Sequence, residues 1–291
     1  MYYIALFFVN LISKLPFCVL YIISDFLYLI VYYVVGYRKE VVRLNLQNSF
    51  PEKTSEERKK IERDFYRHFC DLILEGIKLQ SISRKEMALR MKYIDYEPAI
   101  AHYAEGRSVM LLTSHFGNWE WLSSFSMHLP KDKPVYQVYK QQKDHVADRI
   151  VDKLRRRFGA ENIEMSSFYR SLIQMKREGR LGMFGMLSDQ SPRLNSIHYW
   201  TELLNQETAM IDGTEQIARK FNYPVYYCDV KKIKRGYYTC TLSPIATEPK
   251  ETSEHEITEK YARLLEQTIE EQPPFWLWSH KRWKHKKSEI V

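Results

Sequence analysis

Glycine and cysteine are both scarce in this sequence, with 10 glycines and four cysteines among 291 residues. The cysteines form no CxxC pair and have no zinc-ligand spacing, which argues against a disulfide framework and suits a reducing compartment. GxSxG is absent, so the serine nucleophile of α/β hydrolases is not expected. HExxH and any cluster of three metal ligands are also absent, so we expect neither a metal nor another cofactor.

Aromatic and basic residues, in contrast, are abundant. The chain has 21 Tyr, 14 Phe and 6 Trp, and its formal net charge is +8. Tyr and Trp favour places where one end of the ring is apolar and the other is wet, such as a membrane surface. The positive charge predicts an anionic partner, which could be a phospholipid surface, a nucleic acid or an acidic carrier protein.

The N-terminal segment, residues 1–37, is almost entirely apolar or aromatic and is interrupted only by Lys14, Pro16 and Asp25. Residues 15–37 are long enough to cross a bilayer, which takes about 20 residues. Asp25 would be costly in a simple spanning helix, so an interfacial helix pair that breaks at Pro16 stays open as an alternative. There is no basic stretch before the apolar run and no cleavage site after it, so a signal peptide is not expected.

Basic residues follow this segment directly, at Arg38, Lys39 and Arg43. Because basic flanks tend to stay in the cytoplasm, we expect the body of the protein on the cytoplasmic side of the membrane. The sequence thus divides into a membrane anchor, residues 1–37, and a larger domain, residues 38–291.

The larger domain shows short apolar runs that alternate with amphipathic segments, which predicts an α/β fold with a mixed central sheet and helices on its faces. A long amphipathic helix is expected first, over residues 56–78, with His68 on or near its surface and the N-cap at Thr54 or Ser55. Strands are expected at 109–113, 135–139, 181–187, 224–230 and 237–242. Further helices are expected at 119–129, 144–158, 168–177, 211–221 and 258–270.

The stretch from Thr113 to Glu120 carries the clearest chemical signal. His115 follows a buried strand and precedes a helix, where functional groups of α/β sheets gather, and its ordinary pKa suits a general base. Glu120 lies close enough in sequence to turn back and hydrogen-bond the imidazole. With no serine or cysteine nucleophile evident, the nucleophile would be a hydroxyl of the substrate. The alternative is a strand-end histidine that binds a nearby carbonyl.

Four segments together carry a resemblance to a known family. They are HFGNWEW from His115, RKEVVRLNL from Arg38 with FPE from Phe50, SDQ from Ser188, and WLWSHKRWK from Trp276. Taken in their order along the chain, they resemble the late acyltransferases of lipid A biosynthesis, within the lysophospholipid acyltransferase superfamily and its H-x4-D/E motif. The resemblance covers nearly the whole chain.

The resemblance implies transfer of an acyl group from an acyl carrier protein thioester to a hydroxyl of a lipid A precursor. His115 would deprotonate that hydroxyl, and Glu120 would orient and charge-balance His115. Asn118 and the backbone around Gly117 could donate to the oxyanion of the tetrahedral intermediate.

Other substrate contacts are expected from four residues: Lys140, Arg156, Asp189 and Gln190. Lys140 stands where the family usually has Arg, and a lysine can still meet a phosphate as a point charge. Arg156 belongs to a basic run that could instead be a solvated helix face. Asp189 could orient a basic residue of the site or simply belong to a turn.

The basic, Trp-containing C-terminal segment could bind nucleic acid or a membrane surface. The apolar N-terminus favours the membrane, so the partners expected are the acyl carrier protein thioester, an anionic lipid acceptor and the membrane, without nucleic acid. Arg282 could instead be structural and paired inside the fold. Two alternatives stay open: an acyltransferase that acts on a lysophospholipid or an aminolipid, and a membrane-anchored basic binding protein without catalysis.

Overall fold

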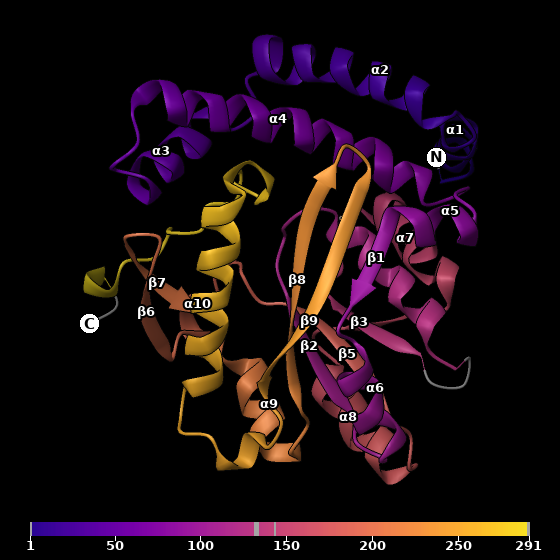
Figure 1. Ribbon diagram of the computed structural model, residues 1–291, viewed down its shortest axis with the longest axis vertical. Helices are drawn as coiled ribbons and strands as arrows, with labels where there is room; N and C mark the ends of the chain where they lie inside the picture. The colour runs from indigo at the N-terminus through magenta and orange to yellow at the C-terminus, as the bar shows by residue number, and fades with distance from the viewer. Residues whose placement is uncertain (1, 131–133, 143, 290–291) are drawn as a thin grey trace.

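The computed structural model describes residues 2–130, 134–142 and 144–289 (Figure 1). The α-helices are α1 (Tyr2–Ser13), α2 (Phe17–Leu29), α3 (Lys39–Ser49), α4 (Ser55–Lys78), α5 (Arg84–Arg90), α6 (Glu97–Ala104), α7 (His145–Arg155), α8 (Phe168–Arg177), α9 (Gly213–Phe221) and α10 (Glu256–Glu271). The strands are β1 (Met91–Ile94), β2 (Val109–Thr113), β3 (Val135–Tyr139), β4 (Glu161–Glu164), β5 (Met183–Leu187), β6 (Tyr199–Leu203), β7 (Gln206–Met210), β8 (Val225–Lys234) and β9 (Tyr237–Ala246).

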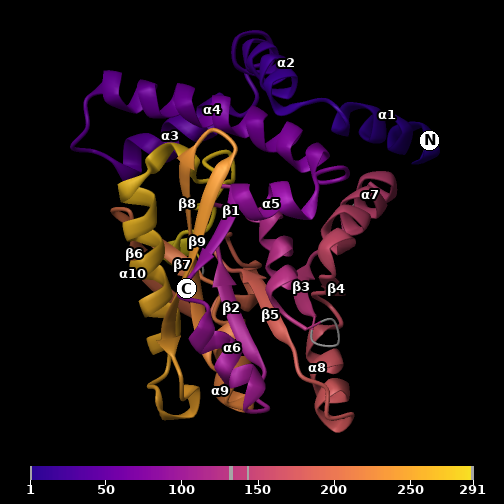
Figure 2. The ribbon, with the colours of Figure 1, turned by 45° about the vertical axis from the view of Figure 1, so that its right-hand side comes forward.

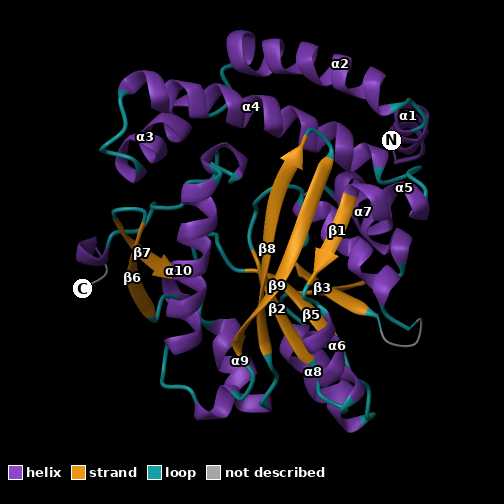
Figure 3. Cartoon of the chain, viewed as in Figure 1, coloured by secondary structure: helices purple, strands orange, loops and turns teal. Residues whose placement is uncertain are grey.

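The central sheet has seven strands in the order β1-β9-β8-β2-β5-β3-β4. Its strands pair in parallel except for the β8–β9 hairpin, so the sheet is mixed. Helices cover its faces, as Figure 3 shows, and β6 and β7 form a separate antiparallel hairpin beside α10. The expected α/β class with a mixed central sheet is therefore confirmed.

Alternate residues of the buried strands supply two cores. In β2, Met110 and Leu112 pack on the side of α8, α9 and α10, whereas Val109 and Leu111 pack on the other side with Trp121. Successive side chains of a strand point to opposite faces of the sheet. When both faces are buried, apolar residues are favoured at every position, and the strand appears in the sequence as a continuous apolar run. This is why the sequence identifies β2 easily.

Helix α4 begins with a capping box, in which Thr54 and Glu57 each bond the other's backbone N–H. It lies across one end of the sheet, with α2 packed on its outer side (Figure 1). His68, expected near the surface, is 2% exposed because α4 is covered on both sides.

The apolar N-terminus folds into two helices that break at Pro16. After Leu29 the second continues as a π-helical stretch, Ile30–Val35, and ends at Gly36 in the left-handed conformation. Within the described residues, Phe17–Val35 is the one helix long and apolar enough to cross a membrane, and it suggests membrane association.

Several elements differ from those expected. Residues Trp119–His128 form a 3-10 helix (η2) rather than an α-helix, and α7 ends at Arg155 before another 3-10 turn, Arg156–Phe158. The short strands β1, β4, β6 and β7 and the helices α5 and α6 were not predicted.

Candidate active site

The site lies at the carboxyl ends of three neighbouring strands. His115 follows β2, Asp189 and Gln190 follow β5, and Lys140 follows β3. Strand β5 runs parallel to both β2 and β3, so the three ends meet at one edge of the sheet. Ser188 donates its backbone N–H to the carbonyl of Thr113 at 3.1 Å, which extends the pairing past the strands. This is the edge where α/β sheets hold their ligands.

His115 and Asp189 are joined by two hydrogen bonds. The imidazole Nδ1 lies 2.8 Å from Oδ1 of Asp189, and the backbone N–H of His115 donates to Oδ2 at 3.0 Å. An ionised carboxylate only accepts, so Nδ1 carries the proton and Nε2 holds the free electron pair. The pair therefore fixes the tautomer that a general base requires.

The carboxyl of Asp189 is buried and fully bonded, since Oδ2 also accepts from Nε1 of Trp276 at 2.9 Å. Burial alone would raise the pKa of Asp189, but the electrostatic interaction with His115 and the hydrogen bonds from His115 and Trp276 outweigh it and hold the pKa below its usual value. Asp189 thus stays ionised beside the imidazole.

Gln190 contacts the other side of the same ring. Its amide nitrogen lies 3.2 Å from Nε2 of His115, and both side chains line a cavity. The amide thus marks the place where a substrate hydroxyl would approach Nε2.

Residues 275–277 of the C-terminal segment pair with the backbone of the loop that follows β2. Phe116 forms a β-bridge with Trp276, Gly117 donates its N–H to the carbonyl of Phe275, and Leu277 donates to the carbonyl of His115. These bonds fix the backbone from His115 to Gly117. They also explain why the C-terminal Trp motif accompanies the histidine motif in this chain.

Two basic residues of that segment turn inward. His280 accepts a hydrogen bond from the backbone N–H of Ser191, and burial lowers the pKa of its imidazole to about 4. Arg282 is 2% exposed and donates to the carbonyl of Ala209, so it is structural, as the sequence allowed.

Because Trp276 and Trp278 are buried in the core, their rings present no stacking surface for bases.

Glu120 does not make the expected hydrogen bond to His115, because that position is taken by Asp189. Instead its carboxylate binds the guanidinium of Arg155 on α7 through bonds of 2.6 and 2.8 Å. Burial would raise the pKa of Glu120, but Arg155 outweighs it and the pKa is lowered. His115 adds to this lowering, so Glu120 remains an anion near the imidazole without touching it.

Asn118 and the backbone of Gly117 were expected to face the oxyanion, but both are turned into the fold. The Asn118 amide donates to the buried carboxyl of Glu75 at 2.7 Å, and its oxygen caps η2 by accepting from the N–H of Trp121. Gly117 adopts φ +56°, and a Cβ there would lie 2.7 Å from Cγ1 of Val230. These residues shape the loop after His115 rather than line the cavity.

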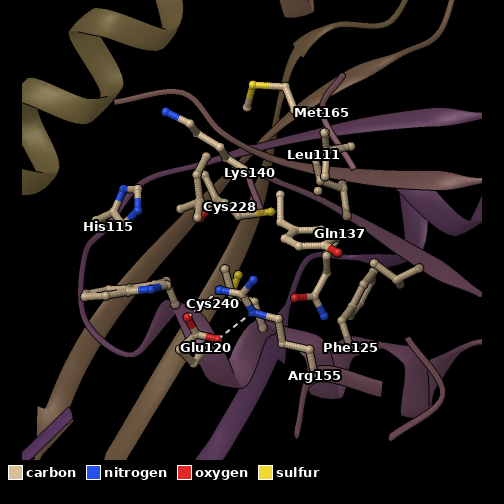
Figure 4. A pocket seen from close by; sticks show the side chains of 18 of the residues that line it. Leu111, His115, Glu120, Phe125, Gln137, Lys140, Arg155, Met165, Cys228 and Cys240 are labelled. Carbon is tan, nitrogen blue, oxygen red and sulfur yellow. Dashed lines mark hydrogen bonds and ion pairs between the residues drawn. The ribbon is translucent and has the colours of Figure 1, made fainter. Parts of the chain in front are cut away.

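The cavity has a volume of about 330 Å³ and runs from His115 to the far side of η2. In Figure 4, His115 lies at one end of the labelled side chains and Phe125 at the other, with the Glu120–Arg155 pair between them. Its walls are largely apolar, with Leu111, Leu122, Phe125, Cys228, Cys240 and Leu242 among them. A cavity with a mainly apolar wall and His115 at one end suits a molecule with a hydrocarbon chain and a reactive head.

Of the two basic residues expected to bind substrate, the structure places one at the cavity. Lys140 is exposed and lines its rim. Arg156 points outward and binds Asp152 one turn away at 3.0 Å. Its neighbour Arg155 lines the cavity instead, because α7 ends there and directs consecutive residues to different sides.

Comparison with protein-family models gives a match over residues 1–285 to the bacterial lipid A biosynthesis acyltransferases. The chain belongs to this family. Membership makes the protein an acyltransferase of lipid A biosynthesis and confirms the resemblance read from the sequence. A comparison with curated proteins gave no match.

In this acyltransferase, three residues that support the site were not singled out from the sequence. Arg155 is one of several consecutive basic residues, so the sequence did not distinguish it. Glu75 is one of many acidic residues in an amphipathic helix, and no pattern marked it as buried. Trp276 was recognised as part of a motif. Its hydrogen bond to Asp189 joins residues 87 positions apart, and a contact that distant in the chain gives no local sequence pattern.

Proposed function

We propose that this acyltransferase moves a fatty acyl group from an acyl carrier protein thioester to a hydroxyl of a lipid A precursor, with Nε2 of His115 as general base. The observation that carries the proposal is the bond between Nδ1 of His115 and the buried, ionised Asp189, at the mouth of an apolar cavity. Asp189 takes the orienting role that the sequence gave to Glu120.

In this reaction Nε2 removes the proton as the substrate hydroxyl attacks the thioester carbonyl, which forms the new C–O bond and a tetrahedral oxyanion. The imidazolium is stabilised by the Asp189 carboxylate. Collapse of the intermediate breaks the C–S bond, and the imidazolium returns its proton to the departing thiolate. No external base or metal is needed to balance these steps.

The cavity wall provides the rest of the site. The acyl chain would lie along the apolar side chains between Leu111 and Phe125. The Gln190 amide, 3.2 Å from Nε2, is the donor closest to the reacting atoms and is our candidate for the oxyanion contact. The Glu120–Arg155 pair would hold the wall next to the thioester.

Lys140 at the rim is a candidate for a phosphate of the acceptor. Arg156, on the outer face of α7, would instead contact the acidic carrier protein. We place the protein at the inner membrane with the catalytic domain towards the cytoplasm, since carrier-bound donors are cytoplasmic and basic residues follow the N-terminal helices.

The test is an assay in which labelled acyl carrier protein thioester is supplied with a tetra-acylated lipid A precursor, using wild type, His115→Ala and Asp189→Asn. We expect transfer by wild type, loss in His115→Ala and a large decrease in Asp189→Asn. Acyl transfer only to lysophospholipid or aminolipid acceptors would overturn the lipid A assignment. Transfer that survives His115→Ala would overturn the mechanism.

A further inference from the structure

The second N-terminal helix has one buried side and one exposed apolar side. Its buried stripe follows helical spacing along α2 and its π-helical continuation, at Phe17, Leu20, Ser24, Tyr28 and Tyr32. The opposite side is apolar and open to solvent: Ile22 is 69% exposed, Phe26 65% and Tyr33 64%. An exposed apolar stripe of this length marks an interaction surface.

Helix α2 is attached along its length to α4, which runs in the opposite direction beneath it (Figure 1). The hydroxyl of Tyr21 donates to Glu75 at 2.9 Å, and Ser24 donates to Asp71 at 2.7 Å. Further along, the guanidinium of Arg67 lies over the ring of Tyr28, 5.2 Å from its centre.

Two more contacts to the N-terminal helices involve the charged residues Arg235 and Lys78. Arg235, in the turn between β8 and β9, binds Asp25 at 2.6 Å and Asp71 at 2.7 Å. Lys78, at the end of α4, donates to the carbonyls of Ser13 and Leu15 at the break between α1 and α2. The helix pair is therefore fixed to the catalytic domain.

A spanning orientation is incompatible with these contacts. Residues 17–35 extend over about 28 Å as a helix, close to the full thickness of the hydrocarbon core. If they stood upright in the bilayer, the second half of α4 would be drawn to the same depth with Arg67, Asp71 and Glu75. Charged side chains at that depth are strongly disfavoured.

We propose that α1 and α2 lie in the plane of the membrane, with their exposed apolar side inserted into one leaflet, and that neither helix crosses the bilayer. Helix α1 contributes Tyr3, Ile4, Phe7 and Phe8, all more than half exposed, and lies along the same side of the molecule as α2 (Figure 2). The two helices thus provide a broad surface of the kind that binds at the boundary of headgroups and acyl chains.

The chemistry of this surface fits an anionic phospholipid leaflet. Within residues 2–37 only Lys14 and Asp25 are charged, and Asp25 is neutralised by Arg235. The exposed Lys14 and Arg38 stand at the ends of α2, where they can meet headgroup phosphates. Arg149 of α7 lies over the ring of Tyr2, which brings the membrane surface next to the helix that carries Arg155.

The first experiment locates the N-terminus. The full-length protein with an N-terminal epitope and a separate C-terminal epitope is treated with protease in spheroplasts and in inverted vesicles. The in-plane arrangement puts both epitopes on the same side of the membrane, so both are cleaved only in inverted vesicles. Cleavage of the N-terminal epitope in intact spheroplasts would show a spanning helix and overturn the proposal.

The second experiment measures depth. Single cysteines at positions 22, 26 and 33, in a Cys18→Ser background, carry a fluorophore, and lipids carry quenchers at defined depths in vesicles that contain phosphatidylglycerol. We expect all three positions to report the same shallow depth. If position 26 were quenched most strongly by lipids whose quencher lies at the bilayer midpoint, the helix would span the membrane. If no position were quenched, a protein partner or a second copy would cover the exposed apolar side of α2. Either result would contradict the proposal.

A variant pair tests the surface itself. Ile22→Asn with Phe26→Asn is expected to weaken partition into these vesicles at least tenfold while leaving the fold intact by circular dichroism. Leu194→Asn, which changes another exposed apolar residue outside the N-terminal helices, is the control and should bind as wild type does. Equal binding of the double variant and the control would overturn the proposal.

Discussion

Nδ1 of His115 and Oδ1 of Asp189 lie 2.8 Å apart, although 74 positions separate the two residues in the chain. The contact exists because β2 and β5 are parallel neighbours that end at the same edge of the sheet. It assigns the proton of the imidazole to Nδ1 and leaves Nε2 available to the substrate.

Asp189→Asn is expected to lower kcat by roughly 10³, because an amide can donate to Nδ1 and so stabilise the wrong tautomer. The KM for the acyl carrier protein thioester should change much less, which steady-state kinetics will show. Asp212→Asn is a matched control, since it alters another His–Asp contact, with His198 at 3.3 Å, away from the cavity. Equal losses of kcat in both variants would point to a general folding defect instead.

The Glu120–Arg155 pair predicts a pH-dependent contribution to stability. The pKa of Glu120 in the folded protein lies below the usual 4.5, so its contribution is complete above pH 4.5 and is lost as the pH falls towards the folded value. Glu120→Gln should lower the free energy of unfolding at pH 7 by about 2 kcal/mol, since it leaves Arg155 without its anion. Thermal unfolding measured from pH 7 down to well below pH 4.5 should show the stabilities of the two proteins converging only at the acid end. A constant difference would mean that the carboxylate charge does not stabilise the fold.

The glycine at position 185 in β5 is expected to control the length of acyl chain that the cavity accepts. It lines the cavity between Leu111 and Gln137, its partners on the two neighbouring strands, and a Cβ there meets nothing closer than 3.7 Å. Gly185→Ile should therefore fold and shorten the preferred donor chain, whereas Gly185→Ala should shift the preference less. Competition between carrier-bound thioesters of different lengths measures this. An unchanged preference would show that the chain lies elsewhere.

Glu75 is predicted to hold the loop after His115 through its buried carboxyl, which accepts from Tyr21, Asn118 and Tyr238 at 2.7–2.9 Å. Glu75→Ala leaves these three donors without an acceptor, so we expect a loss of about 3 kcal/mol in the free energy of unfolding and a lower kcat. Glu75→Gln keeps an acceptor and should cost about 1 kcal/mol. Denaturant unfolding compares the two.

The pKa of Glu75 adds a second observable to that comparison. Burial, followed by the charge of Asp71, raises this pKa above 4.5, so its contribution to stability is complete below pH 4.5 and declines as the pH rises through the folded value. Glu75→Gln, which cannot ionise, should remove this decline. An identical pH profile in wild type and Glu75→Gln would contradict the raised pKa.

Much of the fold could be predicted because its central strands are buried in whole or in large part. Strand β2, which is buried throughout, and strand β3, which is mostly buried, appear in the sequence as apolar runs, and the amphipathic α8 and α10 show helical periodicity. The short strands β4 and β6 are largely unburied and carry mixed side chains, so no periodicity marked them. The 3-10 geometry of η2 follows from packing around Trp121, which local propensity does not report.

For the site, the sequence indicated His115 as the candidate base, but it did not indicate which residue bonds the imidazole in the structure. Glu120 was chosen because it is near in sequence, and nearness in sequence is a poor guide where strands are paired across long intervals. Asp189 was noticed as part of a motif, and only the β2–β5 pairing gives it a role. Likewise Arg156 was preferred to Arg155 because the phase of α7 relative to the cavity depends on tertiary packing.

The bonds between residues 275–277 and the backbone around His115 have a consequence for biosynthesis. During translation the N-terminal helices leave the ribosome first and can settle on the membrane while the sheet is still incomplete. The backbone from His115 to Gly117 gains these partners only after residues 275–277 have emerged. On the in-plane arrangement proposed above, the nascent chain would therefore reach the membrane before its proposed catalytic site is complete.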